Sequence, residues 1–272
     1  MTAPPAFDGV DHLLVGVADL ERARSAWERL GFTVTPRGRH VGWGTANYCV
    51  MFGIDYIELL GIVDPAQHVQ GLDRFLEREG EGTLGLAFGT DDADRTFRAF
   101  DRAGIAGDLP KRLGRMLELP EGDVRPEFDL IHPREAGALG VNGFVCRHRT
   151  PELIRRAEWL DHPNGAEGIA SLTLAVTDPA TVAGRYLALL GEGAVGEDGE
   201  GWTIAAGPHR ILLRFGAAPA GEIIETRITC RDLDRAAALL AEAEISHERA
   251  GQLIAVDPAA ATGVRLFLTE GG

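Results

Sequence analysis

Four segments of the chain share one pattern of apolar and polar positions. In each, apolar residues first alternate with other residues, which predicts a half-buried strand, and then recur every three or four positions, which predicts an amphipathic helix. In the first segment the helix has its apolar face at Leu20, Ala23, Trp27 and Leu30. An aspartate stands between strand and helix in every copy, where its carboxylate can accept from the free N–H groups of the first helical turn.

These segments are internal repeats, and they organise the whole chain. The copies cover residues 11–32, 84–105, 225–245 and a looser stretch from Ser171, with the shared aspartate at Asp19, Asp92, Asp232 and Asp178. Strand-like stretches punctuated by glycine follow each helix, in the first copy at residues 32–36, 47–52 and 56–61. The order strand, helix and three strands therefore occurs four times, which predicts an α+β protein of four βαβββ modules.

One break in the repeats predicts a domain boundary. Residues 150–167 have the pattern of a short helix followed by a turn rich in Pro, Asn and Gly. We therefore expect an N-terminal domain over residues 1–150, a linker over 151–167 and a C-terminal domain over 168–272, with two modules in each domain.

Charge and composition exclude several classes of binding partner. Asp and Glu total 41 against 27 Lys and Arg, for a net charge of −14, which disfavours nucleic acid and anionic membranes. Apolar runs such as residues 57–63 are too short to span a bilayer, and the N-terminus has no signal-peptide pattern, so we expect a cytoplasmic protein. Three separated cysteines argue against a disulfide framework or a zinc knuckle. No P-loop, GxGxxG, GxSxG or HExxH motif occurs, so no nucleotide cofactor is expected.

Three motifs carry a family resemblance: Asp11-His12-Leu13, Gly38-Arg39-His40 followed by Gly44-Thr45-Ala46-Asn47, and Tyr56-Ile57-Glu58-Leu59-Leu60. With the repeats, they resemble the vicinal oxygen chelate superfamily and its glyoxalase-like domain proteins. That superfamily includes glyoxalase I, extradiol dioxygenases, methylmalonyl-CoA epimerase and the bleomycin- and fosfomycin-resistance proteins. The resemblance implies modules paired into two domains with curved mixed sheets, and a cup that holds a divalent metal and a small molecule.

In the superfamily the metal ligands come from the first and fourth strands of each module. The resemblance assigns His12 and Glu58 as ligands, and makes Glu58 a candidate catalytic base. The position equivalent to His12 in the second module is Gly85, which cannot ligate. The last strand of that module, expected at residues 141–148, offers Cys146 or His148 as the third ligand.

In the C-terminal domain the equivalent first-strand positions are Ser171 and Glu225, and we expect that domain to be metal-free. His148 would complete a set of two imidazoles and one carboxylate, and the metal itself is left open among Zn, Ni, Fe and Mn.

Each candidate also has a structural explanation. His12 can be a hydrogen-bonded strand histidine, Glu58 can face solvent, Cys146 can be a core residue and His148 a solvated strand end. The segment with His40, Trp43 and Asn47 is either a substrate-binding loop or a glycine-rich connection.

The resulting functional hypothesis is a metal-dependent lyase or isomerase, or a dioxygenase, acting on a small molecule with vicinal oxygens. Its rival is a metal-free binding protein of the bleomycin-resistance type, which the glycine at position 85 favours. A homodimeric scaffold is a third possibility. No basic cluster of the kind that binds glutathione is evident in the sequence, which disfavours lactoylglutathione lyase activity.

Overall fold

The computed structural model describes residues 4–271 and contains the predicted order of elements four times. The first two modules are β1 (Gly9–Val17), α1 (Leu20–Arg29), β2 (Gly38–His40), β3 (Thr45–Met51) and β4 (Tyr56–Ile62), then β5 (Gly82–Gly89), α3 (Ala93–Arg102), β6 (Lys111–Leu117), β7 (Glu127–Ile131) and β8 (Gly143–His148). The last two are β9 (Ala166–Val176), α4 (Pro179–Leu190), β10 (Val195–Glu197), β11 (Trp202–Ala206) and β12 (His209–Phe215), then β13 (Glu222–Cys230), α5 (Leu233–Glu242), β14 (His247–Ala250), β15 (Leu253–Val256) and β16 (Leu266–Glu270). The predicted α+β fold of four βαβββ modules is confirmed.

The shared aspartate begins each of the four module helices. The side chain accepts a hydrogen bond from the backbone N–H three residues later at Asp19, Asp92, Asp178 and Asp232. Gly31 and Gly104 follow α1 and α3 with φ of +83° and +71°, a conformation that favours glycine. Local sequence therefore fixes both ends of the helices in the first two modules.

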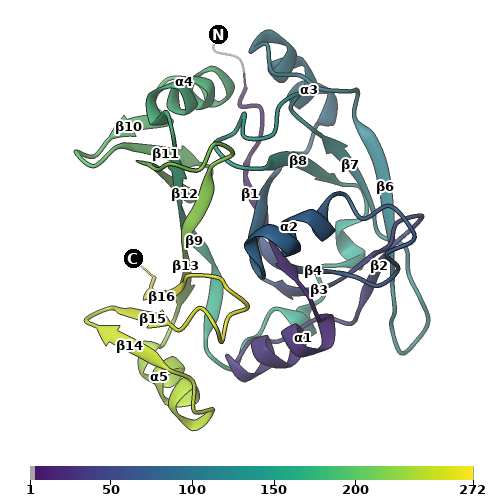
Figure 1. The fold of residues 1–272 in the computed structure, drawn as a ribbon, viewed down its shortest axis with the longest axis vertical. Helices are drawn as coiled ribbons and strands as arrows, with labels where there is room; N and C mark the ends of the chain where they lie inside the picture. The colour runs from purple at the N-terminus through teal and green to yellow at the C-terminus, as the bar shows by residue number, and fades with distance from the viewer. Residues whose placement is uncertain (1–3, 272) are drawn as a thin grey trace.

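The modules pair in two different ways (Figure 1). The first two form a closed barrel in the strand order β1-β4-β3-β2-β6-β7-β8-β5, and the last two form an open sheet in the order β10-β11-β12-β9-β13-β16-β15-β14. Helices α1 and α5 lie at one end of the molecule, and α3 and α4 lie at the other. All eight strands of the first two modules therefore enclose one interior.

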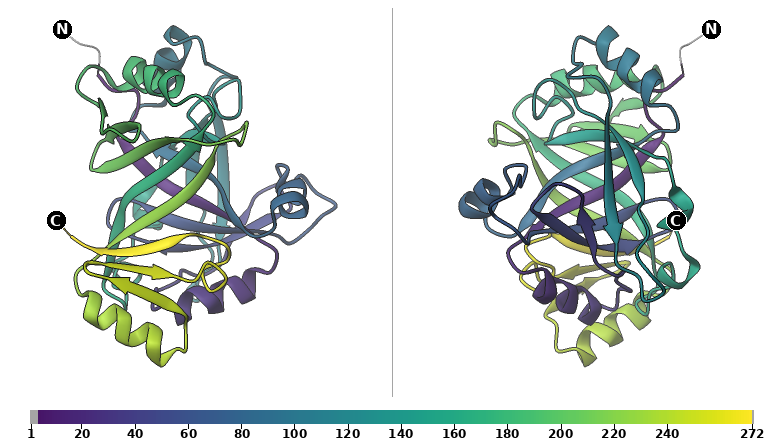
Figure 2. Two further views of the ribbon diagram at one scale, coloured as in Figure 1. Left: turned by 60° about the vertical axis from the view of Figure 1, so that its left-hand side comes forward. Right: turned by 90° about the vertical axis from the view of Figure 1, so that its right-hand side faces the viewer.

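The two halves share one continuous apolar core, built from the buried faces of both sheets and of the module helices. Polar contacts also cross between them: the Trp27 indole Nε1–H donates to Thr262 Oγ1 at 3.0 Å, and Asp55 contacts His209 Nε2 at 2.9 Å. Figure 2 shows the open sheet packed along the side of the barrel. No helix in residues 4–271 has the length and apolar content to cross a membrane.

Several local expectations differ from the structure. Residues 32–36 form no strand; they are an irregular segment whose apolar residue Phe32 packs into the core, and the second strand of the module is β2 instead. An additional helix, α2 (Leu72–Glu79), packs against β1. The segment 150–167 contains two short 3-10 helices, Pro151–Leu153 and Ala157–Trp159, in place of the expected helix.

Candidate active site

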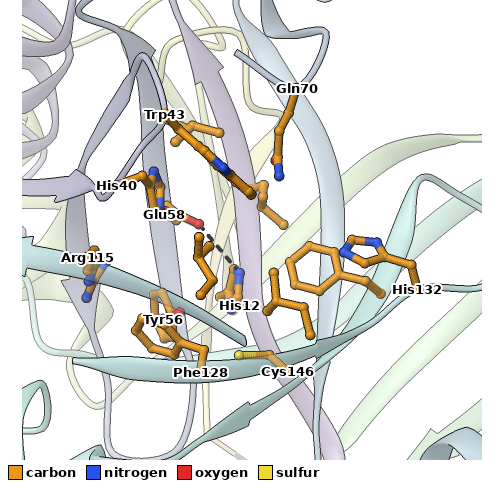
Figure 3. Close-up of a pocket in the computed structure, with 15 residues that line it drawn as sticks. His12, His40, Trp43, Tyr56, Glu58, Gln70, Arg115, Phe128, His132 and Cys146 are labelled. Atoms are coloured by element: carbon orange, nitrogen blue, oxygen red, sulfur yellow. Dashed lines mark ion pairs between the residues drawn. The ribbon is translucent and has the colours of Figure 1, made fainter. Parts of the chain in front are cut away.

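A cavity of about 530 Å³, counting its mouth, opens inside the barrel. Most of its wall is apolar, formed by Leu14, Leu60, Leu113, Phe128, Leu130 and Phe144. Ionisable side chains interrupt this wall, and four of them, His12, His40, Glu58 and Arg115, form the candidate site; Tyr56, His132 and Cys146 also line the cavity (Figure 3). The four site residues come from β1, β2, β4 and β6, so the site depends on the closure of the barrel.

His12 and Glu58 are brought together by the pairing of two neighbouring strands. Strands β1 and β4 run parallel, with His12 opposite Tyr56 and Leu14 opposite Glu58. Residues two apart on a strand share a face, so both side chains enter the barrel. The His12 Nε2 atom lies 3.5 Å from Glu58 Oε2, and the Tyr56 ring stacks on the imidazole with a centroid distance of 4.5 Å. The alternative in which Glu58 faces solvent does not describe this carboxylate, which is buried.

The other nitrogen of His12 is held by its neighbour in sequence. Asp11 Oδ2 lies 2.7 Å from His12 Nδ1, and the same carboxylate lies 2.9 Å from His148 Nε2. Adjacent strand residues normally point to opposite faces, but Asp11 is the extra residue of a bulge between β1 and β5, and a bulge can redirect a side chain. Burial opposes ionisation of Asp11, yet His148 and His12 outweigh it and lower the pKa of its carboxyl well below the usual range.

Asp11 was not assigned a role from the sequence. The available signal was a pair of adjacent polar residues in an otherwise apolar strand, and only the bulge shows how both are used.

The second histidine of the cavity comes from the predicted glycine-rich segment. His40 Nδ1 lies 2.9 Å from Thr45 Oγ1, and its Nε2 lies 3.8 Å from Glu58 Oε1. Trp43, whose ring centroid is 5.7 Å from that of His40, also lines the cavity. Asn47 supports the site indirectly, because its side-chain amide donates to Glu58 Oε1. Gly38 makes this possible, since a Cβ there would overlap the Asn47 side-chain oxygen.

These neighbours set the ionisation of the cavity residues. Burial alone would raise the pKa of Glu58, but His12, His40 and Arg115, with the Asn47 hydrogen bond, lower it below the usual glutamate value. Burial lowers the pKa of His40, although Glu58 acts in the opposite direction. Near neutral pH the cavity therefore contains an ionised carboxylate beside a neutral His40 imidazole.

The second module does not repeat this arrangement. On β4, Glu58 lies opposite Leu14, which is two positions after His12. In the second module Ala87 is two positions after Gly85, and it lies opposite Phe144. The positions of the second module that correspond in register to His12 and Glu58 are thus a glycine and a phenylalanine. The glycine is required by packing, because a Cβ at Gly85 would overlap the carbonyl oxygen of Asn142.

The two alternatives for a third ligand lie on β8, on one face as the alternation predicts. Cys146 lines the cavity, whereas His148 is bonded to Asp11 and its Nδ1 is buried without a partner. Atoms of Asp11, Cys146 and His148 that can ligate a metal lie within 4.8 Å of one another. In the C-terminal half, the Glu225 carboxylate pairs with Arg227 at 2.6 Å.

Arg115 is a charged cavity residue that sequence analysis missed, and His132 is another ionisable one. Arg115 lies on β6 in an alternating stretch and is 3% exposed. In the sequence it is one of three basic residues on a short strand, and nothing local distinguishes it from the two exposed ones.

Two sets of side chains have the chemistry to hold a divalent cation. The first, in the cavity, is His12, His40 and Glu58, in which Asp11 and Thr45 engage the ring nitrogens that face away from Glu58. A partner on the far nitrogen is typical of metal-ligating histidines. The second set is Asp11, Cys146 and His148, in which the carboxylate is already paired with imidazoles. Among residues 4–271, the second set has candidate ligand atoms that all lie within 4.8 Å of one another, whereas the first set lines the cavity.

Comparisons with known proteins agree with this fold. The model of the family described as "Glyoxalase-like domain" matches residues 10–190. No curated protein matches the sequence. A crystal structure of a hypothetical protein from Staphylococcus aureus is similar with a TM-score of 0.71 and 12% identity, over 96% of this chain and 99% of that one.

Two further similar structures have names that mention a function. A xylose isomerase-like TIM barrel/4-hydroxyphenylpyruvate dioxygenase fusion protein gives a TM-score of 0.55 and 16% identity, over 99% of this chain and 50% of its own. A variant of 4-hydroxymandelate synthase from Streptomyces coelicolor gives a TM-score of 0.57 and 15% identity, over 99% of this chain and 94% of that one. At these identities the likeness concerns the fold alone.

Proposed function

The chain belongs to the glyoxalase-like domain family of the vicinal oxygen chelate superfamily, and on this premise we propose that the barrel cavity is the active site of a divalent-metal-dependent enzyme. The observation that carries the proposal is the convergence of His12 Nε2 and the buried Glu58 carboxylate, 3.5 Å apart, on one cavity. A buried carboxylate is costly unless it is paired or coordinates a metal. The substrate class is a small molecule with vicinal oxygens.

His12 and Glu58 are the proposed ligands, and His40 is the preferred third. Its Nε2 is oriented towards Glu58 Oε1, whereas the Nε2 of His148 is occupied by Asp11. His148 and Cys146 stay as the predicted alternatives. Two imidazoles and one carboxylate leave coordination positions open for substrate oxygens, and this set suits Zn, Ni, Fe or Mn.

The proposed reaction is proton transfer next to a carbonyl group, as in a lyase or isomerase. A bound divalent cation supplies Lewis acidity, which stabilises negative charge on a substrate oxygen. Glu58 is ionised at neutral pH and can accept a proton, while the Asn47 amide fixes the orientation of its carboxylate. Asp11 fixes the tautomer of His12 by accepting from Nδ1–H, and the apolar walls exclude water.

A dioxygenase reaction is the second possibility within the same proposal. The ligand composition matches the set that non-haem iron oxygenases use, and two of the similar structures carry the names of a dioxygenase and of hydroxymandelate synthase. The metal dependence of activity distinguishes this reaction from proton transfer. A dioxygenase should lose activity when iron is withheld, and zinc or nickel should not restore it.

Metal content tests the proposal directly. Protein purified without a His-tag and titrated with Ni, Zn, Mn and Fe should bind about one divalent ion per chain, and His12→Ala and Glu58→Gln should lose it. His247→Ala, in the C-terminal half, is the matched control and should bind like the wild type. A wild-type protein that takes up none of these ions contradicts the proposal.

That outcome would favour a metal-free binding protein instead. One specific observation supports this second candidate: the ligand positions of the second module hold Gly85 and Phe144, so half of the family's metal site is replaced by apolar surface.

A further inference from the structure

The cavity contains a buried cation that the proposed proton transfer does not use. The Arg115 side chain is almost inaccessible to solvent, yet no carboxylate of residues 4–271 lies within 4.0 Å of its guanidinium. Its Nη1–H donates to the Cys49 thiol at 3.3 Å, and its Nε–H has no partner. A thiol is a weak acceptor, and burial raises the pKa of Cys49, so this contact supplies no negative charge.

Other arginines on or next to the barrel strands form ion pairs with carboxylates. Arg112, on the same strand, is exposed and pairs with Asp129 at 3.6 Å, and Arg149 pairs with the same carboxylate at 2.8 Å. A guanidinium remains charged at any physiological pH, and a buried charge is costly unless it is paired. The Glu58 carboxylate acts on Arg115 only from beyond ion-pair distance, so an anion bound in the cavity, whose wall Arg115 lines, would supply the direct partner (Figure 3).

We propose that Arg115 is an anion subsite that binds the carboxylate of a small monoanionic ligand whose apolar, ring-sized body lies against Phe128 and Phe144. This inference rests on the proposed function in taking the barrel cavity as the substrate site, and it adds the class of ligand.

Three features of the cavity support this class. A guanidinium presents parallel N–H groups that match the two oxygens of a carboxylate. Arg115 already lies over the Phe128 ring, 5.7 Å from its centroid, so the anionic group would sit beside an aromatic wall. The wall of the cavity is largely apolar, with Leu113, Phe128 and Phe144 among its lining residues, which suits the body of such a ligand.

The cavity lining offers one guanidinium to an anionic ligand group. Arg115 is the only arginine or lysine among the cavity-lining residues, and Glu58 is their only carboxylate. A peptide such as glutathione carries two carboxylates, and Arg115 is the only permanently charged side chain of the cavity that could pair with either of them. The subsite therefore favours a simple carboxylic acid over a glutathione conjugate.

Binding of matched probes tests this subsite without any metal. Phenylacetate and its neutral analogue phenylacetamide are titrated into the metal-free protein by calorimetry, with phenylphosphonate as a second anion. We expect phenylacetate to bind the wild type about tenfold or more tighter than phenylacetamide, as a charge-assisted hydrogen bond requires. Arg115→Met should abolish this preference, Arg115→Lys should keep part of it, and Arg112→Met should leave it unchanged.

Other outcomes overturn the proposal. Equal binding of phenylacetate and phenylacetamide by the wild type, or a preference that survives Arg115→Met, removes the subsite. Preferential binding of phenylphosphonate removes its assignment to carboxylates. If Arg115 has only a structural role, Arg115→Met should lower the melting temperature markedly, whereas removal of an unpaired buried charge should leave it unchanged or raise it.

The two proposals fail separately. Arg115→Met should still take up the metal, because His12, His40 and the Asn47 hydrogen bond still lower the pKa of Glu58. A wild type that binds metal but shows no anion preference refutes the subsite alone. A wild type that binds phenylacetate but no metal refutes the proposed enzyme alone.

Discussion

The Asp11→Asn substitution tests how the site is held together. In the wild type one buried carboxylate contacts two imidazoles, His12 Nδ1 at 2.7 Å and His148 Nε2 at 2.9 Å. Asparagine has the same shape but no charge and only one oxygen; with that oxygen at the Oδ2 position, which contacts both imidazoles, its NH₂ group would lie at the Oδ1 position, 2.9 Å from His148 Nε2. The variant replaces two charge-assisted hydrogen bonds by neutral ones and brings an amide NH₂ group against His148, which together should lower the free energy of unfolding by about 2–4 kcal/mol.

The same change should weaken metal binding, because Asp11 supports His12 from behind. Loss of such a supporting partner typically costs about 10–100-fold in metal affinity. Urea denaturation measures the stability change, and competition with a chelating dye measures the affinity.

Asp129→Asn is the matched control for this prediction. Asp129 is a buried carboxylate on β7 of the same barrel, paired with Arg149 at 2.8 Å, but it does not line the cavity. This control should lose stability and retain metal affinity. Wild-type stability and wild-type metal affinity in Asp11→Asn would refute the role assigned to Asp11.

Three further predictions concern the framework. Trp27→Phe removes the hydrogen bond to Thr262 and should cost about 1 kcal/mol of unfolding free energy, whereas Trp27→Ala should cost about 3–5 kcal/mol; equal losses in urea denaturation would contradict this. Gly85→Ala should destabilise by about 1–3 kcal/mol in the same assay, because its Cβ would overlap the Asn142 carbonyl, and a neutral effect would show that β5 can shift. Burial lowers the pKa of His162, whose Nδ1 accepts a backbone N–H, so below about pH 6.5 the unfolded chain gains a proton that the folded chain resists. The free energy of unfolding of the wild type should therefore fall between about pH 6.5 and pH 5 more steeply than that of His162→Gln, by up to about 1.4 kcal/mol per pH unit. Parallel pH profiles of the two proteins would refute this.

The repeated modules were predictable because their signals are local. A capping aspartate and a helical period lie within about 20 residues of each other, and each of the four aspartates caps a helix in the structure. The irregular segment 32–36 was wrongly predicted as a strand, because its apolar residues serve tertiary packing without pairing to a neighbouring strand.

The site was harder to predict because it depends on strand register. His12 and Glu58 were chosen from the sequence and lie together, but their roles as ligands stay predictions. The place of Asp11 depends on a bulge, and the burial of Arg115 depends on how β6 joins the barrel, neither of which leaves a local pattern. The proximity of His40 to Glu58 likewise arises from tertiary pairing of β2, β3 and β4.

The central claim is that His12 and Glu58 hold one divalent ion in the barrel cavity. Anomalous diffraction, collected at the absorption edge of the metal bound in solution, tests it most directly. The account predicts a single strong peak about 2.0–2.2 Å from both His12 Nε2 and a Glu58 carboxylate oxygen. A cavity without a peak in crystals soaked with that metal, or a peak at Asp11, Cys146 and His148 instead, would contradict it.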